Sequence, residues 1–305
     1  MGDGFGAKVG GGTPYLPGMN REDFDNPLGT AGGVPPTEQE GPVGELERLG
    51  VADLVAAMHA VECEVDAAVE AALPAVTAFV EALVPRLARG GRLFYLGAGT
   101  SGRLGIVDAS ECPPTFGVPS GRVVGLIAGG DGAIREAVEG AEDDAEAAWR
   151  DLAPYAPGPD DTVVGIAASG RTPYAVGGVR AARAAGLLTA AVTCNPGTAL
   201  AAAVDHPIEA LTGPEFVTGS TRLKAGSATK RILNLITTVA HIRLGHVRGS
   251  RMVDMRLSNK KLHERAVRTV CDLSGCSVED AVRSLAEAGS VRGALDRLAS
   301  LPPTA

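Results

Sequence analysis

The chain lacks any run of Lys and Arg residues, and its acidic residues outnumber its basic ones by 36 to 28, for a formal net charge of −8. An acidic chain without a basic cluster is a poor match for nucleic acid or an anionic membrane, so we expect neither as a partner. An anionic small ligand would then have to be held by local hydrogen-bond donors rather than by the overall charge of the protein.

Metal-ligand spacing, a disulfide framework, a signal peptide and a membrane span are also missing from the sequence. The five cysteines are odd in number and scattered, which indicates reduced thiols in a cytoplasmic protein. Cys271 and Cys276 are close, but no second pair completes a zinc site, and the five histidines show no ligand pattern. No basic-then-apolar leader and no run of 18 apolar residues is present. We therefore expect a cytoplasmic protein without a metal.

Glycine is abundant, with 41 residues, and together with proline it dominates the first 36 positions. Such a segment buries too little apolar surface to offset its ordering entropy, so residues 1–36 are predicted to be a disordered arm. A helical pattern then runs through residues 51–88. We predict one domain over residues 37–250 and a helical region over residues 251–305.

Short apolar runs alternate with helical patterns through the predicted domain, which predicts an α/β fold with a parallel sheet covered on both faces. Ligands of such sheets bind beyond the carboxyl ends of the strands. The predicted strands are residues 92–96, 122–128, 162–167, 188–193 and 207–211. The predicted helices are residues 102–109, 132–152, 173–185, 221–244 and 259–271, followed by two short helices that Ser277 and Ser290 introduce.

Gly97, Gly99 and Gly102 follow the first strand with the spacing G-x-G-x-x-G, which raises the possibility of a dinucleotide site. That site also needs an acidic residue about 20 positions further on. The acidic residue at the end of the second predicted strand, Asp131, follows more than 30 residues after Gly97. Pro113 and Pro114 also predict an early end to the first helix. A nicotinamide-dependent oxidoreductase therefore stays a distant alternative.

Hydroxyl-rich, glycine-flanked loops favour a single phosphate instead. Thr100 and Ser101 follow the first strand, Ser169 and Thr172 follow the third, and residues 218–221 open the long helix. Glycine lets backbone N–H groups approach an anion, and a helix N-terminus adds partial positive charge. Each loop alone is more often a helix cap. Three such loops in one fold favour a pocket for a small phosphorylated ligand.

Two carboxylates are candidates for acid and base chemistry near that pocket. Glu111 precedes two prolines, which would give it a rigid turn. Glu142 borders the apolar stripe of the acidic helical pattern, although most acids there belong on a solvated face. A protonated carboxyl can donate to a leaving oxygen while an ionised one removes a proton beside a carbonyl. Elimination and isomerisation both fit this pair.

Several long segments resemble N-acetylmuramic acid 6-phosphate etherases, and the resemblance spans roughly residues 37–298. The segments are GAGTSGRLGIVDASECPPTFGVP, GLIAGGDGAIREAVEGAED, VVGIAASGRTPY, TCNPG, EFVTGSTRLKAGSATKRILNLITT and MVDMRLSNKKLHERAVR. The resemblance implies a sugar-isomerase (SIS) fold, a three-layer α/β/α sandwich, with a small C-terminal helical appendage. It also implies a homodimer with pockets near the subunit interface and a lyase that needs no metal or redox cofactor.

The resemblance also implies roles for the two carboxylates. The family breaks the ether that joins D-lactate to carbon 3 of N-acetylmuramic acid 6-phosphate. By the resemblance, Glu111 would protonate the lactate oxygen as this bond breaks, and Glu142 would take the carbon-2 proton of the ring-opened sugar, after which water adds. We expect Ser101, Ser169 and Thr172, with Thr100, to hold the phosphate. The candidates for the lactyl carboxylate are the cations Arg103, Arg222 and Lys224.

Two alternatives share the predicted fold. The first is a non-catalytic sugar-phosphate sensor similar to the glucokinase regulatory protein, which has two SIS modules where this chain has room for one. The second is an aldose–ketose isomerase, which would convert its substrate without releasing lactate. The release of lactate therefore separates both alternatives from the etherase.

Overall fold

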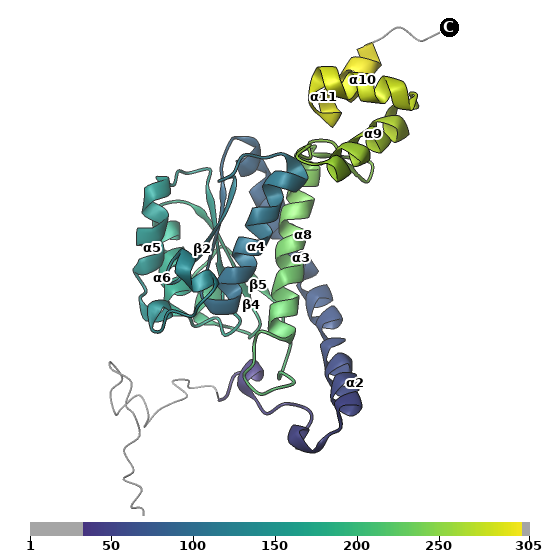
Figure 1. Ribbon diagram of the computed structural model, residues 1–305. Helices are drawn as coiled ribbons and strands as arrows, with labels where there is room; N and C mark the ends of the chain where they lie inside the picture. Colours follow the sequence, from purple (N-terminus) through teal and green to yellow (C-terminus); the bar gives the residue numbers. More distant parts are fainter. Residues whose placement is uncertain (1–32, 301–305) are drawn as a thin grey trace, which may run out of the picture. The chain divides into compact units, whose positions relative to one another are not determined.

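The computed structural model describes residues 33–300, and from Pro35 onward these form one compact unit (Figure 1). The predicted disordered arm lies outside the described residues except for its last four positions. Thr37, which follows it, is buried within a short 3-10 helix, η1 (Pro36–Glu38).

A five-stranded parallel sheet forms the centre of the unit, in the order β2-β1-β3-β4-β5. Leu93 pairs with Val123 on one side and with Thr162 on the other, so the carboxyl ends of the strands reach one common edge. The predicted parallel sheet is therefore confirmed, with shifts of one or two residues at the strand ends. The strands are β1 (Leu93–Gly97), β2 (Val123–Ile127), β3 (Thr162–Ile166), β4 (Leu188–Thr193) and β5 (His206–Glu209).

Helices cover both faces of the sheet because alternate strand residues point to opposite sides. Leu93 and Tyr95 join a cluster with α3, α4 and α8, whereas Phe94 and Leu96 join one with α5, α6 and α7. Figure 1 shows α4 and α8 side by side on one face and α5 and α6 on the other. The helices of the first layer are α3 (Val65–Ala88), α4 (Gly99–Phe116) and α8 (Lys224–Arg243); those of the second are α5 (Ala147–Leu152), α6 (Pro173–Ala184) and α7 (Ala199–Ala202).

The helical run Val51–Ala88, which comprises α2 (Val51–Glu62) and α3, is long and apolar enough to cross a membrane by length and composition alone. One face of α3 packs into the first core cluster through Val69, Val76, Phe79 and Leu83. This packing is typical of a core helix, which passes the same test of length and composition.

Three helices after residue 250 share a separate apolar cluster that includes Val253, Ala266, Leu285 and Leu295. Ser277 begins the second of them by accepting a hydrogen bond from the Asp280 backbone N–H, as predicted from its cap signal. The helices are α9 (Lys260–Ser274), α10 (Val278–Ala288) and α11 (Val291–Ser300), and a short hairpin, β6 (Val247–Arg248) and β7 (Arg251–Met252), precedes them. The division of domains at residue 250 stays a prediction.

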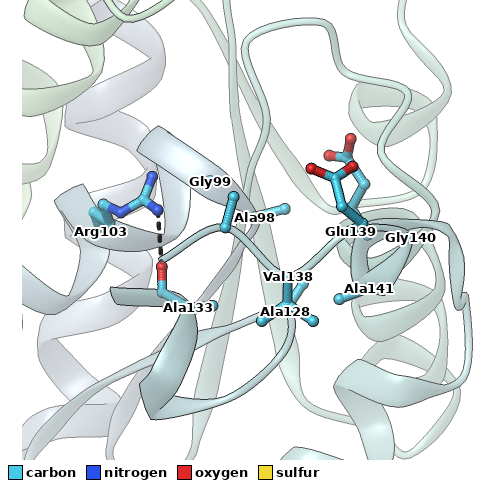
Figure 2. Close-up of a pocket in the computed structure, with 11 residues that line it drawn as sticks. Ala98, Gly99, Arg103, Ala128, Ala133, Val138, Glu139, Gly140 and Ala141 are labelled. Carbon is cyan, nitrogen blue, oxygen red and sulfur yellow. Dashed lines mark hydrogen bonds between the residues drawn. The ribbon is translucent and has the colours of Figure 1, made fainter. Parts of the chain in front are cut away.

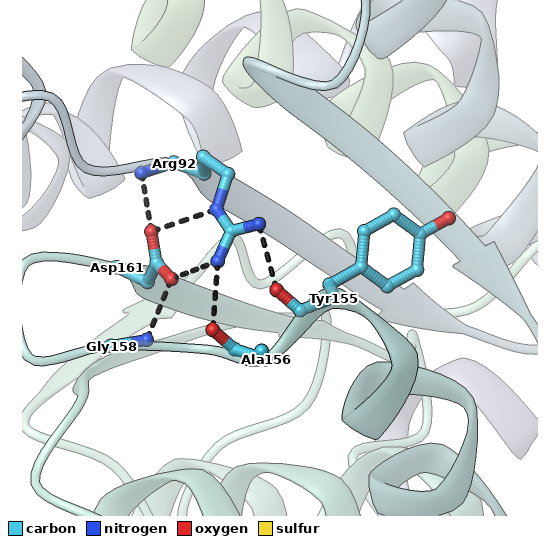
Figure 3. Close-up of polar contacts among 5 residues, drawn as sticks. All are labelled: Arg92, Tyr155, Ala156, Gly158 and Asp161. Carbon is cyan, nitrogen blue, oxygen red and sulfur yellow. Dashed lines mark hydrogen bonds and ion pairs between the residues drawn. The ribbon is translucent and has the colours of Figure 1, made fainter.

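The amino-terminal edge of the sheet is closed by a network around Arg92 and Asp161 (Figure 3). The Arg92 guanidinium donates to both Asp161 oxygens, at 3.1 and 2.6 Å, and to the Tyr155 and Ala156 carbonyls. The Asp161 carboxylate also accepts from the backbone N–H groups of Arg92 and Gly158. These contacts link the residues that precede β1 and β3, which are neighbours in the sheet.

Two helix predictions were wrong. The helix α4 does not end at residue 109 but continues through Pro113 and Pro114 to Phe116. Burial of Cys112 and Phe116 in the core holds this last turn despite the missing N–H groups.

The predicted helix over residues 132–152 is instead a long loop with two 3-10 turns, η3 (Asp131–Ile134) and η4 (Ala141–Asp143), before the short α5. Gly140 lies in the left-handed region with φ of 70°, which interrupts any helix there.

Candidate functional site

A cavity of about 210 Å³ lies where loops from the carboxyl ends of the strands meet. Thr100 and Ser101 reach it after β1, Glu142 reaches it from the loop after β2, and Ser169 and Thr172 reach it after β3. The parallel sheet explains this convergence because its strands end at one edge. Five of the predicted site residues therefore line one cavity, and their roles stay proposals.

The three glycines of the first loop bring α4 close to the sheet. A side chain at Gly102 would lie 2.7 Å from the Gly97 carbonyl oxygen, and Gly99 has a positive φ of 50°. Only glycine fits both requirements without strain. The start of α4 thereby borders the cavity at Gly99 and Thr100, where the helix N-terminus favours an anion.

The long helix α8 reaches the same cavity through Ala225, Gly226 and Thr229. It begins three residues later than predicted because the Glu215 carboxylate accepts from the backbone N–H groups of Lys224 and Ala225, at 2.9 and 3.0 Å. Glu215 is fully buried, and this burial raises the pKa of its carboxyl although the two N–H donors oppose the shift. No local pattern revealed this cap, since Glu215 lies nine residues before Lys224.

A second cavity of about 160 Å³ adjoins the first, with which it shares Ala98, Gly99 and Glu142. Figure 2 shows residues that line this second cavity, among them Arg103. Arg103 lines it and donates to the carbonyl oxygens of Ile134 and Ala133, at 2.9 and 2.8 Å. Arg103 thereby holds the loop that carries Glu142, and it is the one predicted cation that borders either cavity in the described part of the chain.

Three other predicted residues do not line these cavities. Glu111 is exposed on α4, ten residues beyond Ser101, which corresponds to about 15 Å along the helix axis. Lys224 is only 1% exposed, and its Nζ donates to Glu64 at 2.6 Å, so its charge joins α8 to the start of α3. Arg222 is exposed in the loop before α8.

Glu38 lines the larger cavity, and the sequence analysis missed it. The neighbouring Thr37 is held by Asn195, which accepts from its backbone N–H at 3.1 Å and donates to its hydroxyl at 2.8 Å. Asn195 also donates to the Ala168 carbonyl beside the cavity. The signal that could have found Glu38 was Asn195 itself, the asparagine of the TCNPG motif, for which no partner was predicted.

The larger cavity offers hydroxyls, helix N-termini and the two carboxylates Glu38 and Glu142. Hydroxyl and amide donors suit a phosphate, while a carboxylate at the same cavity can exchange a proton with the ligand. Within residues 33–300, no group of three or more His, Cys, Asp or Glu side chains is placed to hold a metal ion. The expectation of a reaction without metal stays a prediction.

Known proteins resemble this chain over most of its length. It is 50% identical over 262 residues to the N-acetylmuramic acid 6-phosphate etherase of Christiangramia forsetii, a match that covers 86% of this chain and 96% of that protein. It is 52% identical over 254 residues to the etherase of the same name from Rubrobacter xylanophilus, with coverage of 83% and 84%.

Two further comparisons concern the fold. A domain model described as the glucokinase regulatory protein N-terminal SIS domain matches residues 75–183. A phosphoheptose isomerase from Francisella tularensis has a similar structure, with a TM-score of 0.50 and 17% identity over 64% of this chain and 100% of that one. These matches agree with the predicted SIS fold.

Proposed function

The chain belongs to the N-acetylmuramic acid 6-phosphate etherase family, and from this membership and the geometry of the cavity we propose that it cleaves the D-lactyl ether of N-acetylmuramic acid 6-phosphate. The products are N-acetylglucosamine 6-phosphate and D-lactate. The observation that carries the proposal is that Glu142 borders the same cavity as Ser101, Ser169 and Thr172. A carboxylate that we propose as the base thus borders the same cavity as a group of donors suited to phosphate.

The hydroxyls of Ser101, Ser169 and Thr172, with Thr100, hold the phosphate together with the N-terminus of α4. Phosphate binding at this position leaves the sugar to extend toward the loop that carries Glu142. Arg103, in the adjoining cavity, supplies a positive charge for the lactyl carboxylate, and this is the best placed of the three candidate cations. Electrostatic attraction there would orient the ether bond for cleavage.

Glu142 acts as the base on the ring-opened sugar, whose carbon-2 proton is acidic because it lies beside the aldehyde. The electron pair of the broken carbon-2–hydrogen bond forms the double bond between carbons 2 and 3 as the bond from carbon 3 to the lactyl oxygen breaks. That oxygen takes a proton from an acid, for which we propose Glu111. Water then adds its hydroxyl to carbon 3 and a proton to carbon 2.

The proposal includes a homodimer in the cytoplasm. The odd number of scattered cysteines supports the compartment. Exposed apolar side chains on α3 and α8 support the homodimer, because another copy of the chain could cover them. They include Leu73, Val239 and Ile242. Because the proposed substrate carries a phosphate, the reaction must follow a step that phosphorylates N-acetylmuramic acid.

Isotope labelling tests this function and separates it from its alternatives. In D₂O enriched in H₂¹⁸O, elimination followed by addition puts deuterium at carbon 2 and ¹⁸O at carbon 3 of the N-acetylglucosamine 6-phosphate. The D-lactate keeps the unlabelled ether oxygen. Release of ¹⁸O-labelled lactate would refute the elimination. An isomerised sugar that retains its lactyl group would favour the isomerase, and binding without any product would favour the sensor.

A further inference from the structure

The proposed reaction needs a proton transfer beyond those of Glu142 and Glu111. The carbon-2 proton is acidic only beside an aldehyde, so the closed sugar ring must open before Glu142 acts. Opening removes a proton from the carbon-1 hydroxyl and adds one to the ring oxygen. A general base within hydrogen-bonding reach of that hydroxyl would accelerate the step.

Glu38 is placed to be this base. Of the described residues that line the larger cavity, only Glu38 and Glu142 carry a carboxylate, and no histidine lines either cavity. The other polar side chains of the larger cavity are hydroxyls. A carboxylate is ionised near neutral pH and can accept a proton, whereas a hydroxyl mainly exchanges hydrogen bonds. Glu38 is therefore the base that remains once Glu142 is assigned to carbon 2.

A second carboxylate is costly in a cavity that binds an anion. The proposed substrate brings a phosphate and a lactyl carboxylate, and Glu142 adds a third negative group. Like charges repel, and they do so more strongly where the protein excludes water. None of the ion pairs among the described residues includes Glu38. Its charge thus lacks a partner in the fold and is available to a hydroxyl of the ligand.

The segment that carries Glu38 is held on both sides. Before it, Thr37 is fully buried and is bound by Asn195 through its backbone N–H and its hydroxyl. After it, the Gly41 backbone N–H donates to the Thr218 hydroxyl at 3.0 Å. These two anchors lie four residues apart and fix the backbone of Glu38 between them. Such fixation is what a base needs in order to reach one particular hydroxyl.

Gly219 leaves the room that the Glu38 carboxylate occupies. A side chain at this position would lie 2.9 Å from the Glu38 Oε2 atom, which is closer than such atoms approach one another in proteins. Gly219 belongs to the third hydroxyl-rich loop, residues 218–221, whose Thr221 lines the same cavity as Glu38. This loop thus accommodates a carboxylate of the protein itself at the cavity.

We propose that Glu38 opens the sugar ring before Glu142 acts. Its carboxylate takes the proton of the carbon-1 hydroxyl, whose electron pair forms the aldehyde double bond as the bond between carbon 1 and the ring oxygen breaks. The ring oxygen takes a proton from water, and Glu38 later returns its own proton to water. The proposal rests on the proposed etherase function, because that function requires the open aldehyde.

Exchange between the two anomers of the bound sugar tests this step without the cleavage. Each opening and closing of the ring interconverts the α and β anomers at carbon 1, and exchange NMR spectroscopy of the carbon-1 proton measures the rate. In Glu142→Gln the base for cleavage is absent, so N-acetylmuramic acid 6-phosphate stays intact. At saturating substrate we expect this variant to exchange the anomers faster than they exchange in buffer. Adding Glu38→Gln should lower the enzymatic rate by about 10² or more.

Glu40→Gln is the matched control. Glu40 is exposed in the same segment, two residues after Glu38, and it lines neither cavity. Glu40→Gln combined with Glu142→Gln should exchange the anomers as fast as Glu142→Gln alone. Equal losses from Glu38→Gln and Glu40→Gln would show an effect of charge and would overturn the proposal.

Two other results would also overturn it. The first is an unchanged exchange rate after Glu38→Gln at saturating substrate, even with a higher KM, because Glu38 would then only bind the sugar. The second is no enzymatic exchange in Glu142→Gln alone, because Glu142 would then open the ring. Failure of the proposed function is distinguishable, since the wild-type protein would release no D-lactate. Glu38 and Glu142 are exposed, so we expect unchanged melting temperatures, and these are measured for every variant.

Discussion

The two edges of the sheet use polar side chains in opposite ways. At the amino edge, the Arg92 and Asp161 side chains bind each other and the neighbouring backbone groups (Figure 3). At the carboxyl edge, Ser101, Ser169 and Glu142 face a cavity instead. Polar groups that satisfy one another stabilise the fold, whereas polar groups that line a cavity remain available to a ligand. Substitutions at the two edges should therefore change different quantities.

The largest effect is expected for Glu142→Gln at the carboxyl edge. The amide cannot remove the carbon-2 proton, so we expect kcat to fall by about 10²–10⁴, the usual contribution of a general base. The melting temperature should not change, because Glu142 is exposed. The matched control is Glu139→Gln, which alters a carboxylate of the adjoining cavity only. A comparable loss in both variants would point to charge rather than to a base.

Asp161→Asn should have the largest effect at the amino edge. Asp161 is 4% exposed, and removing its charge leaves the Arg92 guanidinium with neutral acceptors only, among them the Tyr155 and Ala156 carbonyls. Because the Arg92 side chain is 29% exposed, the loss of this pair should lower the free energy of unfolding by about 2–3 kcal/mol, which urea denaturation measures. The neighbouring Asp160→Asn breaks the exposed pair with Arg89 and should cost less than about 1 kcal/mol. Similar losses in both would contradict the account.

A fall in pH should also lower the free energy of unfolding, because it protonates Asp161 at the amino edge. Burial raises the pKa of this carboxyl, but the hydrogen bonds from Arg92 and Gly158 outweigh burial and hold the pKa below its ordinary value of 3.8. The stabilisation is therefore present above that value and is lost as the pH falls through the lowered pKa. The Asp161→Asn variant should lack this one contribution to the loss, while carboxyls such as Asp205 and Asp254 keep theirs.

His241, also near the amino edge, should make the stability of the fold depend on pH in a milder range. Its ring stacks on Phe116 at 4.4 Å, and burial lowers its pKa from 6.5 to about 4. Between these values the unfolded chain binds a proton that the folded chain excludes, so His241 contributes a fall of about 3 kcal/mol in the free energy of unfolding from pH 7 to pH 4. His241→Phe should lack this contribution. Urea denaturation at both pH values measures it, and identical falls would refute the assignment.

The smallest effect is expected for Ser169→Ala at the carboxyl edge. Loss of one hydroxyl donor to the phosphate should raise KM about tenfold, which corresponds to about 1.4 kcal/mol. Ser220→Ala is the matched control, because Ser220 belongs to the third hydroxyl-rich loop but does not line the cavity. Unchanged KM and kcat for Ser169→Ala would remove this residue from the phosphate site.

The strands and the hydroxyl-rich loops were predictable because their signals are local. Apolar runs, glycines and hydroxyls within a few residues specified the parallel sheet and the edge where Thr100 and Ser169 meet. The path of α4 through Pro113 and Pro114 was not predictable, since burial of Phe116 overrides the local preference for a helix end. The prediction of a helix over residues 132–152 was wrong for a similar reason, because the acidic pattern of the loop that carries Glu142 resembles a solvated helix.

The contacts that complete the site depend on distant parts of the chain. Glu38 reaches the cavity through Thr37 and Asn195, which lie 158 residues apart, and no pattern within one segment contains that contact. Lys224 has the charge expected for a carboxylate ligand, but Glu64 binds it in the fold. Glu111 precedes two prolines in the sequence, but the structure continues α4 through them and leaves Glu111 exposed, outside the lining of the cavity.

The central claim is that the carboxyl-edge cavity is a phosphate-dependent etherase site. The most direct test is the rate of D-lactate release by the wild-type protein from N-acetylmuramic acid 6-phosphate and from the same sugar without its phosphate. We expect rapid release from the first substrate and a kcat/KM lower by about 10³ for the second, because the donors of the cavity would lack their anion. No release from either substrate, or equal rates from both, would contradict the account.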